Sequence, residues 1–402
     1  MHIVVVGNSI AADCLLGELF QRRQQQAVSV TVIGAEHHSA YNRVQLSQVL
    51  AGDADSSAIA LRDTDWYTGN GVRLMTGVQV TSIDRSTQRV HLDSGDDLAY
   101  DKLVLATGAR ARVPAAADAS LAGVQVFRTL DDARALIDTP ASEHTVVFGG
   151  GLLGLEAAAG LLARGRTVTL VHRNGWLLNR QLDDAAGRLL LDNLVARGLS
   201  VHLNAELATV NGDTAVQSVT LDDGTEIPAQ QLVFATGIEP RTELAVDAAL
   251  AVNRGVVVDR SLQTADPVVF ALGECAECAG ETVGLVPPIR DHAAVLADTL
   301  LGRPGQPYVR REHATQLKVA GIDVFSAGDV NAHTDHVILF DDPLTPARRK
   351  LVLEDGRLVA IMLYGDVRDG PWLHSVMQNG TDTHALRDRL LFGRAYCEGL
   401  AA

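Results

Sequence analysis

Three glycines mark the stretch whose residue types and spacing best match a known chemistry. Residues 145–156 read TVVFGGGLLGLE, and Gly149, Gly151 and Gly154 form a G-x-G-x-x-G pattern between an apolar run and an alanine-rich segment. In a strand–turn–helix unit, the first glycine permits a tight turn, the second lets the backbone approach a pyrophosphate, and the third allows close helix packing. The helix N-terminus offers N–H groups to the anion. We therefore predict a dinucleotide site here rather than a purely structural turn.

A weaker copy of this pattern stands at the start of the chain. The apolar residues 2–6 are followed by Gly7, and the next two positions of the pattern are filled by Ser9 and Ala12. Serine is small enough for a close backbone approach, and alanine is allowed at the third position. This turn is a second candidate dinucleotide site, although its motif alone is weak.

Two charged residues follow this first turn. The second apolar run, 28–33, ends near Glu36, whose carboxylate could hydrogen-bond the ribose hydroxyls of an adenosine. Glu36 could equally be a solvated loop acid. Arg43 could pair with a pyrophosphate through its guanidinium, or it could lie free on the surface. The sequence leaves these alternatives open.

The chain repeats one plan twice. Residues 103–108 read LVLATG and residues 232–237 read LVFATG, a match that is nearly residue for residue. Each copy therefore runs from a strand and a glycine turn, at Gly7 and at Gly149, to a strand that ends in Ala-Thr-Gly. An internal duplication is stronger evidence than either motif alone, and it predicts two bound dinucleotides.

The second copy departs from the first where a nucleotide is selected. An acid is expected just after its second strand, 167–171, but the sequence continues with His172 and Arg173, and Arg180 follows. No carboxylate stands ready for a ribose 2′-hydroxyl, and basic side chains suit a 2′-phosphate. This favours NADPH over NADH. The alternative is that Arg173 points to solvent and a backbone group holds the ribose, which would leave NADH acceptable.

The bulk composition limits the classes of function. The 402 residues are 47% hydrophobic and 21% charged, with a net charge of −15. These values indicate a globular protein and argue against a nucleic-acid partner, which needs a basic surface. No apolar run reaches about 18 residues, so we expect no membrane span. Residues 1–10 lack the features of a signal peptide and are predicted to contain the first strand.

The cysteines point to a reducing environment. The four residues Cys14, Cys275, Cys278 and Cys397 are too few and too scattered for a disulfide scaffold, so we expect a cytoplasmic protein. Cys275 and Cys278 form a C-x-x-C pattern, but no second pair exists, and we expect no metal site. A redox pair needs its first cysteine at a helix N-terminus, so a redox disulfide is the less favoured interpretation.

Taken together, these motifs resemble those of the pyridine nucleotide-disulfide oxidoreductase superfamily, the flavoprotein reductases that bind two dinucleotides. The closest likeness is to the FAD- and NAD(P)H-binding module of assimilatory nitrite reductase large subunits, and to the stand-alone flavoprotein electron-transfer subunits of assimilatory nitrate reductases. The segments that carry the resemblance are YNRVQLS (41–47), GGGLLGLEAA (149–158), QLD (181–183), ATGIEPR (235–241), FALGECAE (270–277), GLVPP (284–288) and LKVAGIDVFSAGD (317–329).

The resemblance implies which residues hold the cofactors. FAD would be held by Gly7, Ser9, Ala12, Glu36, Arg43, Val80, Thr107, Gly108, Gly273 and Glu274. Glu274 stands where many relatives have an aspartate that binds the ribityl chain. The nicotinamide nucleotide would be held by Gly149, Gly151, Gly154, Glu156, His172, Arg173 and Gly237. Glu156 would lie near the nicotinamide–flavin junction.

Two departures from the superfamily narrow the chemistry. The disulfide-reductase and NADH-oxidase branches place a reactive cysteine in the helix after the arginine turn, where residues 46–49 here read LSQV. Disulfide or peroxide chemistry is therefore not expected. The nitrite reductases also carry cysteine-rich iron–sulfur and sirohaem regions, which this sequence lacks, so we expect that it does not reduce nitrite itself.

The motif order and the resemblance predict an α/β protein with two Rossmann-like domains, for FAD and NAD(P)H, and a small C-terminal α+β domain. The FAD-binding domain is expected to be discontinuous, formed by residues 1–112 and 240–308. The NAD(P)H-binding domain would span 113–239, and the C-terminal interface domain would span 309–402.

The C-terminal domain carries two further predictions. Asp355 and Gly356 are a strong signal for a β-hairpin. The runs 310–311 and 348–350 concentrate arginine and lysine in an otherwise acidic chain. They could form a docking surface for an acidic carrier, or they could be ordinary solvated runs.

We therefore interpret the chain as an FAD-dependent NAD(P)H oxidoreductase that takes hydride from a nicotinamide nucleotide and passes electrons to a redox partner protein. No side chain is assigned as a catalytic acid, base or nucleophile. The resemblance favours the electron-transfer component of assimilatory nitrate or nitrite reduction, with a component of that reductase as partner. The alternatives are a rubredoxin- or ferredoxin-type reductase of another pathway, or a flavin-binding redox sensor without rapid turnover.

Overall fold

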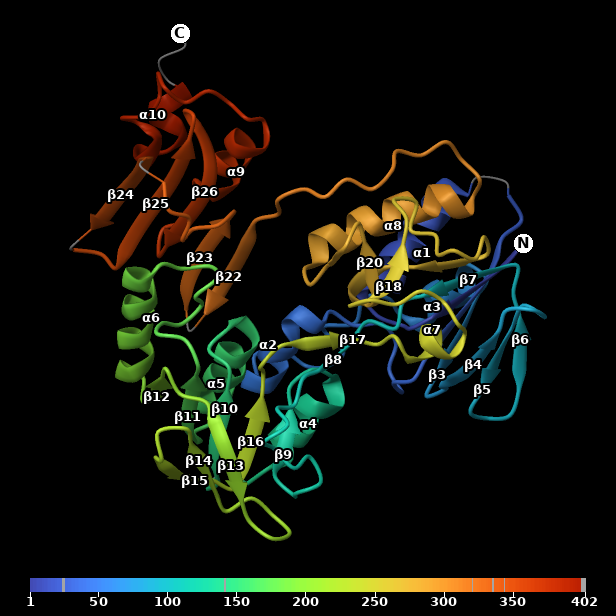
Figure 1. Cartoon of the computed structure of the whole chain (residues 1–402), viewed down its shortest axis with the longest axis horizontal. Helices are drawn as coiled ribbons and strands as arrows, with labels where there is room; N and C mark the ends of the chain where they lie inside the picture. The colour runs from blue at the N-terminus through green and yellow to red at the C-terminus, as the bar shows by residue number, and fades with distance from the viewer. Residues whose placement is uncertain (24–25, 141, 320, 335, 343, 399–402) are drawn as a thin grey trace.

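The chain folds around two parallel five-stranded sheets (Figure 1). The computed structural model describes residues 1–23, 26–140, 142–319, 321–334, 336–342 and 344–398. The central strand of each sheet ends at one of the two glycine turns, and the C-terminal unit contains a third five-stranded sheet, which is antiparallel. The two-copy plan expected from the sequence is therefore present in the fold.

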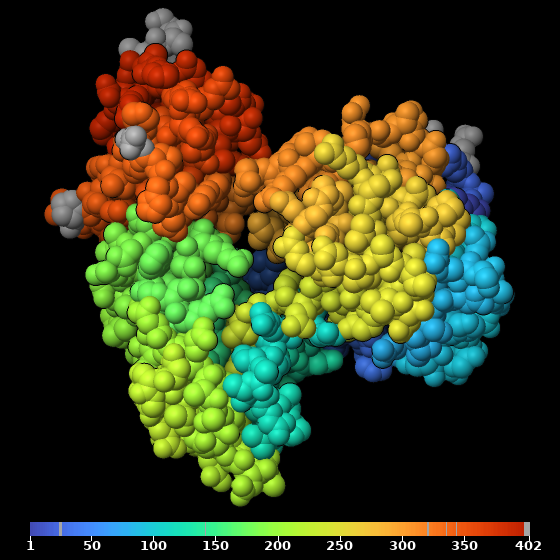
Figure 2. Space-filling model, in the orientation of Figure 1, coloured from blue at the N-terminus to red at the C-terminus, as the bar shows by residue number. Residues whose placement is uncertain are grey.

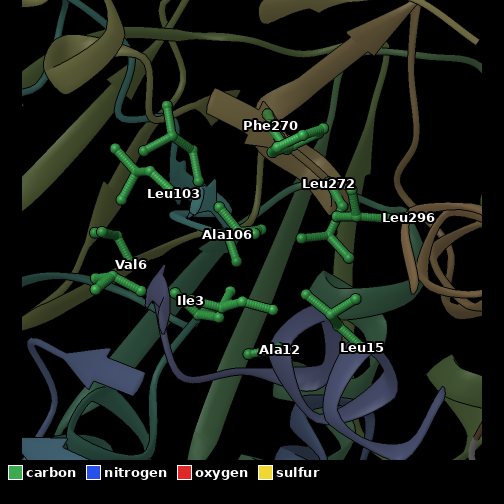
Figure 3. Packing of buried hydrophobic residues seen from close by; sticks show 14 of the residues in the cluster. Ile3, Val6, Ala12, Leu15, Leu103, Ala106, Phe270, Leu272 and Leu296 are labelled. Atoms are coloured by element: carbon green, nitrogen blue, oxygen red, sulfur yellow. The ribbon is translucent and has the colours of Figure 1, made fainter. Parts of the chain in front are cut away.

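The first parallel sheet has β1 (His2–Val6) at its centre. The strands follow one another across the sheet in the order β19 (Val269–Ala271), β7 (Lys102–Leu105), β1, β2 (Ser29–Gly34) and β3 (Val72–Thr76). Helices α1 (Ile10–Arg22) and α8 (Val286–Leu300) pack against each other beside this sheet. Figure 3 shows side chains of the sheet and of both helices in one buried cluster, including Ile3, Phe270, Leu15 and Leu296. Strands covered by helices read as continuous apolar runs, as β1 does.

The second parallel sheet repeats this arrangement around β10 (His144–Phe148). The strands follow one another across the sheet in the order β12 (Ser200–Leu203), β11 (Thr167–His172), β10, β16 (Gln231–Phe234) and β9 (Val124–Val126). The helices of this half are α4 (Leu130–Asp138), α5 (Leu152–Ala163) and α6 (Asp184–Ala196). In each copy, the strand before the glycine turn pairs in parallel with the strand that ends in Ala-Thr-Gly.

Each half also carries a three-stranded antiparallel sheet. These are β4 (Val80–Asp84), β5 (Arg89–Leu92) and β6 (Asp97–Ala99) in the first half, and β13 (Leu207–Asn211), β14 (Ser218–Leu221) and β15 (Glu226–Pro228) in the second. The remaining elements of the two halves are η1 (Arg43–Gln45), α2 (Leu46–Ala51), α3 (Thr64–Gly69), α7 (Glu243–Asp247), β18 (Val256–Val258), η2 (Gly273–Cys275), β20 (Ala276–Cys278) and β21 (Glu281–Thr282).

The two halves are joined by a short antiparallel ribbon of β8 (Ala109–Ala111) and β17 (Ile238–Pro240). The two Ala-Thr-Gly motifs brace it symmetrically. The hydroxyl of Thr107 donates to the carbonyl of Arg241 at 2.8 Å, and the hydroxyl of Thr236 donates to the carbonyl of Arg112, also at 2.8 Å. Each motif therefore fixes the strand that leaves the other half.

The C-terminal unit is an antiparallel sheet of five strands with helices α9 (Gly370–Gln378), η3 (Leu390–Phe392) and α10 (Arg394–Glu398). Its strands, in sheet order, are β22 (Thr315–Val319), β23 (Ile322–Ala327), β26 (Arg357–Tyr364), β25 (Ala347–Glu354) and β24 (His336–Asp342). The predicted hairpin at Asp355 and Gly356 joins β25 to β26, and both residues have positive φ, 48° and 72°. This is the backbone that a two-residue hairpin turn requires.

This unit sits on the second half of the molecule, beside α6 (Figures 1 and 2). Met362 and Tyr364 of β26 belong to the same buried apolar cluster as Leu190 and Leu194 of α6. A segment without regular structure, residues 303–314, connects it to α8. Among the described residues, no helix is long and apolar enough to cross a membrane.

Candidate functional site

One cleft of about 1420 Å³ lies between the two halves (Figure 2). Both glycine turns and both Ala-Thr-Gly strand ends contribute to its walls. The predicted site residues that line it are Gly7, Ser9, Glu36, Arg43, Val80, Thr107, Gly108 and Glu274 from the first half, and Gly151, Glu156 and Gly237 from the second. The predicted residues Ala12, Gly149, Gly154, His172, Arg173 and Gly273 do not line it.

The first glycine turn has the shape that a dinucleotide needs. Gly7 has φ +118°, and a Cβ there would lie 2.0 Å from the carbonyl oxygen of Ala106, so only glycine fits. Ser9 is the N-cap of α1, and its side chain makes no capping hydrogen bond. The first N–H groups of a helix have no partner within the helix, so this end of α1 can receive an anion from the cleft.

The second turn fits in the same way. Gly149 has φ +119°, and a Cβ there would lie 2.4 Å from the carbonyl oxygen of Ala235. A Cβ at Gly154 would lie 1.8 Å from the carbonyl oxygen of Gly149, which explains the close packing of α5 on the turn. At Gly151, by contrast, a Cβ would meet no atom of the described residues within 4 Å. Because Gly151 faces the cleft, this open space can admit a pyrophosphate.

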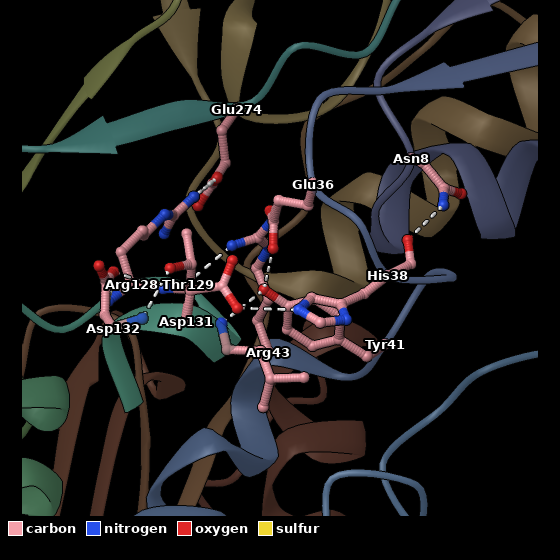
Figure 4. Close-up of polar contacts among 11 residues, drawn as sticks. Asn8, Glu36, His38, Tyr41, Arg43, Arg128, Thr129, Asp131, Asp132 and Glu274 are labelled. Carbon is pink, nitrogen blue, oxygen red and sulfur yellow. Dashed lines mark hydrogen bonds and ion pairs between the residues drawn. The ribbon is translucent and has the colours of Figure 1, made fainter. Parts of the chain in front are cut away.

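Glu36 lies in the cleft as part of a polar cluster, and not as a free loop acid (Figure 4). Its carboxylate forms an ion pair with Arg43 and accepts a hydrogen bond of 2.6 Å from the hydroxyl of Tyr41. Burial is the main cause of a raised pKa at Tyr41, so this hydroxyl remains a donor. Arg43 also donates to the carbonyl of Arg128 at 2.9 Å, so it is not a free surface residue.

Arg128 is a cleft residue that the sequence analysis missed. It lines the cleft just before α4 and forms an ion pair with Glu274 on the opposite half (Figure 4). Its Nε is buried without a partner in the described part of the chain. The only feature of the neighbouring sequence that could have drawn attention to Arg128 is the capping box that follows it, in which Thr129 and Asp132 cap α4. Glu36 and Glu274 each therefore meet an arginine in the cleft.

Glu156 reaches the cleft from the second turn of α5. Burial raises the pKa of its carboxyl to about 7, against a smaller opposing effect of a hydrogen bond with Ser47. Ser47 lies on α2, the helix in which the cysteine-dependent branches of the superfamily carry their reactive thiol. The arrangement holds a carboxyl that changes charge near neutral pH beside a hydroxyl, with no thiol at that position.

His172 lies under the second glycine turn, not in the cleft. Only 7% of the residue is exposed, and its Nδ1 accepts a hydrogen bond of 3.0 Å from the N–H of Gly150. Burial lowers the pKa of the imidazole, which is therefore neutral at pH 7. The expectation that His172 offers a positive charge to a 2′-phosphate is wrong for this structure, because the ring is needed as an acceptor. Arg173 and Arg180 are exposed.

Ala12 and Gly273 support the first turn by packing. Ala12 is fully buried in α1, and a Cβ on Gly273 would lie 2.9 Å from the Cβ of Ala11. The N–H of Gly273 donates to Nδ1 of His292 at 3.4 Å. His292 is fully buried, and burial lowers its pKa to about 4, so the ring stays neutral and can accept.

The C-x-x-C pair is a packing element. Cys275 and Cys278 are buried, at the end of η2 and of β20, and their thiols donate to backbone carbonyls. Burial raises the pKa of both thiols, which disfavours the reactive thiolate. Neither cysteine forms a disulfide within the described residues. The same residues contain no group of three histidine, cysteine or acidic side chains that could hold a metal ion.

The basic run 348–350 is not a docking surface. Arg348 pairs with Asp183, Arg349 pairs with Asp366 and Asp369, and Lys350 lies 3.6 Å from Asp183. All three side chains are largely buried, with 11–15% exposed. The expectation failed because each of these charges pairs with an acidic side chain outside the run, which the run itself does not reveal. Residues 310 and 311 are exposed, and Arg310 pairs with Glu281.

Most of the chain matches known families. Residues 1–294 match the family described as pyridine nucleotide-disulphide oxidoreductase, and residues 314–381 match the rubredoxin NAD+ reductase C-terminal domain. The chain is 38% identical to the nitrite reductase [NAD(P)H] of Bacillus subtilis (strain 168), over 95% of this chain and 48% of that protein. It is 36% identical to the assimilatory nitrate reductase electron transfer subunit of the same organism, over 92% of this chain and 48% of that protein.

Two further likenesses cover nearly the whole of both proteins. The chlorobenzene dioxygenase ferredoxin reductase component of Cupriavidus sp. (strain PS12) is 31% identical, over 92% of this chain and 90% of that protein. The covalent putidaredoxin reductase–putidaredoxin complex contains a chain of the same fold, with a TM-score of 0.87, 26% identity, and coverage of 100% of this chain and 99% of that one. By contrast, the chain spans about half the length of the two Bacillus relatives. Two dinucleotide turns facing one cleft and the match over residues 1–294 show that the chain belongs to the pyridine nucleotide-disulphide oxidoreductase family, which implies FAD and NAD(P)H as its cofactors.

Proposed function

We propose that this chain is an FAD-dependent oxidoreductase that takes hydride from NAD(P)H and passes the electrons to a separate acceptor protein. The observation that supports this most is the cleft between the two halves, to which both glycine turns contribute. Gly108 and Glu274 stand on one wall, and Gly151 and Glu156 stand on the other. A hydride can pass directly between two cofactors only if their reactive rings meet in one enclosed space.

We assign the chain's own residues to binding and orientation. The turn at Gly7 and the N-terminus of α1 would take the FAD pyrophosphate, with Arg43 as its counter-charge and Glu36 at the adenosine ribose. Glu274 and Arg128 would flank the ribityl chain. The turn at 149–154 would take the pyrophosphate of the nicotinamide nucleotide. When bound, FAD supplies the chemistry of accepting a hydride and releasing electrons to a one-electron carrier.

We infer that the acceptor belongs to assimilatory nitrate or nitrite reduction, because the two Bacillus relatives match nearly the whole chain at 36–38% identity. The alternative acceptor is a rubredoxin or a ferredoxin. It is supported by the match of residues 314–381 and by the Cupriavidus reductase component, which is covered over 90% of its length. We place the protein in the cytoplasm because a chain with only four cysteines suits a reducing compartment. We also propose the domain limits given above, 1–112 with 240–308, 113–239 and 309–402.

NADPH is our proposed preference. No carboxylate stands directly after β11, and the exposed Arg173 is free to bind a 2′-phosphate, whereas His172 is not. A charge-assisted contact of this kind contributes about 1.5–3 kcal/mol, or roughly one to two decades in affinity. The ratio of kcat/KM for NADPH to that for NADH tests the preference. Arg173→Ala should reduce kcat/KM for NADPH selectively, and a wild-type protein that prefers NADH would contradict the proposal.

The proposed acceptor is tested by rapid mixing. The FAD-loaded protein is reduced with one equivalent of NADPH and mixed in turn with a nitrate or nitrite reductase catalytic partner, a rubredoxin and a [2Fe–2S] ferredoxin. We expect fast reoxidation of the protein by the reductase partner. Fast transfer only to a rubredoxin or ferredoxin would favour the alternative. Fast reduction of the flavin followed by slow electron transfer to every carrier would favour the alternative function, a redox sensor without rapid turnover.

A further inference from the structure

The loop of residues 173–183 connects β11 to α6 in the proposed nucleotide-binding half, and we call it the nucleotide loop. It begins with Arg173, directly after β11, and therefore lies where the fold places the adenosine end of the nucleotide. Two different parts of the molecule hold it. One is the glycine turn of its own half, and the other is the C-terminal unit.

The glycine turn makes one hydrogen bond to the residue just before the loop and another to Leu178, within the loop. The N–H of Gly150 donates to His172 at 3.0 Å, and the carbonyl of Gly150 accepts from the N–H of Leu178 at 2.9 Å. Leu178 has φ +51° although it is a buried leucine, a conformation that costs about 1–2 kcal/mol and persists only where surrounding contacts impose it. A displacement of the loop must therefore displace the peptide of Gly150, which stands inside the pyrophosphate-binding turn.

The C-terminal unit holds the other end of the loop through an ion pair. Asp183 is the N-cap of α6 and accepts from the N–H of Ala186 at 3.0 Å. Arg348 of β25 donates to both of its carboxylate oxygens, Nε to Oδ1 at 3.2 Å and Nη2 to Oδ2 at 2.9 Å. Burial alone would raise the pKa of Asp183, but hydrogen bonds from Arg348 and Ala186, with the charges of Arg348 and Lys350, outweigh it and lower the pKa. The pair is thus ionised and bidentate, the geometry that best fixes two groups.

A second contact reaches the backbone of the loop. The side-chain amide of Asn331 donates to the carbonyl of Asn179 at 3.1 Å and to that of Leu182 at 3.3 Å. The N–H of Asp183 also lies 3.3 Å from the sulfur of Met362, inside the apolar cluster shared by the two units. The carbonyls of Asn179 and Leu182 are therefore held by a side chain of the C-terminal unit, although Leu182 also accepts from the indole N–H of Trp176 within the loop at 3.0 Å.

We propose that the C-terminal unit completes the nicotinamide-nucleotide site, and that Arg348 and Asn331 are positioning residues that hold the nucleotide loop against the glycine turn. This inference rests on the proposed function, since it concerns the nucleotide of that reaction. Arg348 does not line the cleft. Its effect passes through Asp183 and the loop to Arg173 and Gly150. Nucleotide affinity then depends on how the C-terminal unit is seated.

The chain offers a matched control for this effect. Arg349 is the next residue of β25, and its side chain has the same exposure as that of Arg348, 11%. It pairs with Asp366 at 2.9 Å and with Asp369 at 3.1 Å, both inside the C-terminal unit. Arg349→Gln therefore removes an equally buried guanidinium without removing a contact to the nucleotide loop.

The test measures binding of 2′,5′-ADP and of ADP-ribose by calorimetry to the FAD-loaded protein, with the flavin spectrum and the Tm recorded for each variant. For the probe that wild type binds more tightly, Arg348→Gln should raise Kd about tenfold, the size of coupling seen between linked sites. Arg349→Gln should change Kd less than about twofold. Asp183→Asn, which keeps the helix cap, should weaken binding as Arg348→Gln does, and the double variant should be no worse than either single variant.

The outcomes separate the inference from the proposed function. Unchanged affinity in Arg348→Gln, or an equal loss in Arg349→Gln, would overturn the inference while the nucleotide site stands. If wild type binds neither probe, the proposed function and the inference both fall. If Arg348→Gln does not fold, Asn331→Ala decides, because it removes only the two hydrogen bonds to the loop. We expect about a threefold rise in Kd from those bonds, and no rise would overturn the inference.

Discussion

Gly151→Ala should weaken nucleotide binding and leave the stability of the fold nearly unchanged. The backbone of Gly151 has φ −85° and ψ −174°, which alanine adopts without strain, and no atom of the described residues would lie within 4 Å of the new Cβ. Alanine is a poorer N-cap than glycine, but it also reduces the entropy of the unfolded chain by a comparable amount. We therefore expect a change in unfolding free energy of less than about 0.5 kcal/mol.

The new methyl group would nevertheless fill the space that the pyrophosphate is expected to occupy. Loss of one charge-assisted N–H contact costs about 1.5–3 kcal/mol, which predicts a Kd for NAD(P)H raised about 10- to 100-fold. Calorimetry on the FAD-loaded protein with the oxidised nucleotide, NAD(P)+, which cannot reduce the flavin during the titration, measures the same loss of affinity, and a thermal melt measures stability. Nucleotide binding as tight as that of wild type would refute the assignment of this turn.

Two other glycines provide the controls. A Cβ at Gly154 would lie 1.8 Å from a backbone carbonyl, so Gly154→Ala should lower the Tm as well as the affinity. Gly69, on α3, is also surrounded by open space among the described residues but does not line the cleft. Gly69→Ala should change neither quantity beyond the small helix effect. The pattern of three results distinguishes a lost ligand contact from general damage.

Two further predictions follow from the buried side chains of the first half. His292 has a pKa of about 4 when folded, below the usual 6.5, so its stabilising contribution is complete above pH 6.5 and is lost as the pH falls towards 4. This amounts to about 2 kcal/mol between pH 7 and pH 5, and the difference in Tm between these pH values should shrink in His292→Gln; an unchanged difference would contradict the argument. Replacing both Cys275 and Cys278 with serine should leave the rate of flavin reduction by NADPH unaltered, because their thiols only donate to backbone carbonyls. A large rate loss with FAD still bound would restore a redox role for the pair.

The sequence predicted those parts of the fold that depend on local backbone geometry. A glycine turn needs specific residues because Cβ atoms at Gly7 and Gly149 would collide with the neighbouring strand, and such a requirement is visible in a single sequence. The Ala-Thr-Gly ends could be recognised because the same short pattern occurs twice in the sequence. Their threonines brace the ribbon between the halves, a role that the motif itself did not reveal. The hairpin at Asp355 was predicted because its positive φ restricts the residue type.

Contacts between distant segments could not be predicted in this way. Arg128 and Glu274 are 146 residues apart, and Arg348 and Asp183 are 165 apart, so no pattern of spacing connects them. The run at 348–350 was expected on the surface because isolated charges usually are, but each charge here meets an acid that lies outside the run, and Asp183 comes from a distant segment. His172 was read as a basic residue because its burial depends on the loop that folds over it. The stretch from 74 to 80 is not one continuous strand, because Gly77, with φ +67°, lies between β3 and β4.

We propose that two dinucleotides meet in the cleft between the halves. An anaerobic titration of the purified, FAD-reconstituted protein with NADPH, and separately with NADH, tests it most directly, with flavin absorbance as the readout. We expect one FAD per chain, released as FAD on denaturation, and complete bleaching by one equivalent of the preferred nucleotide. A protein that takes up no FAD, or whose bound FAD is bleached by neither nucleotide, would contradict it.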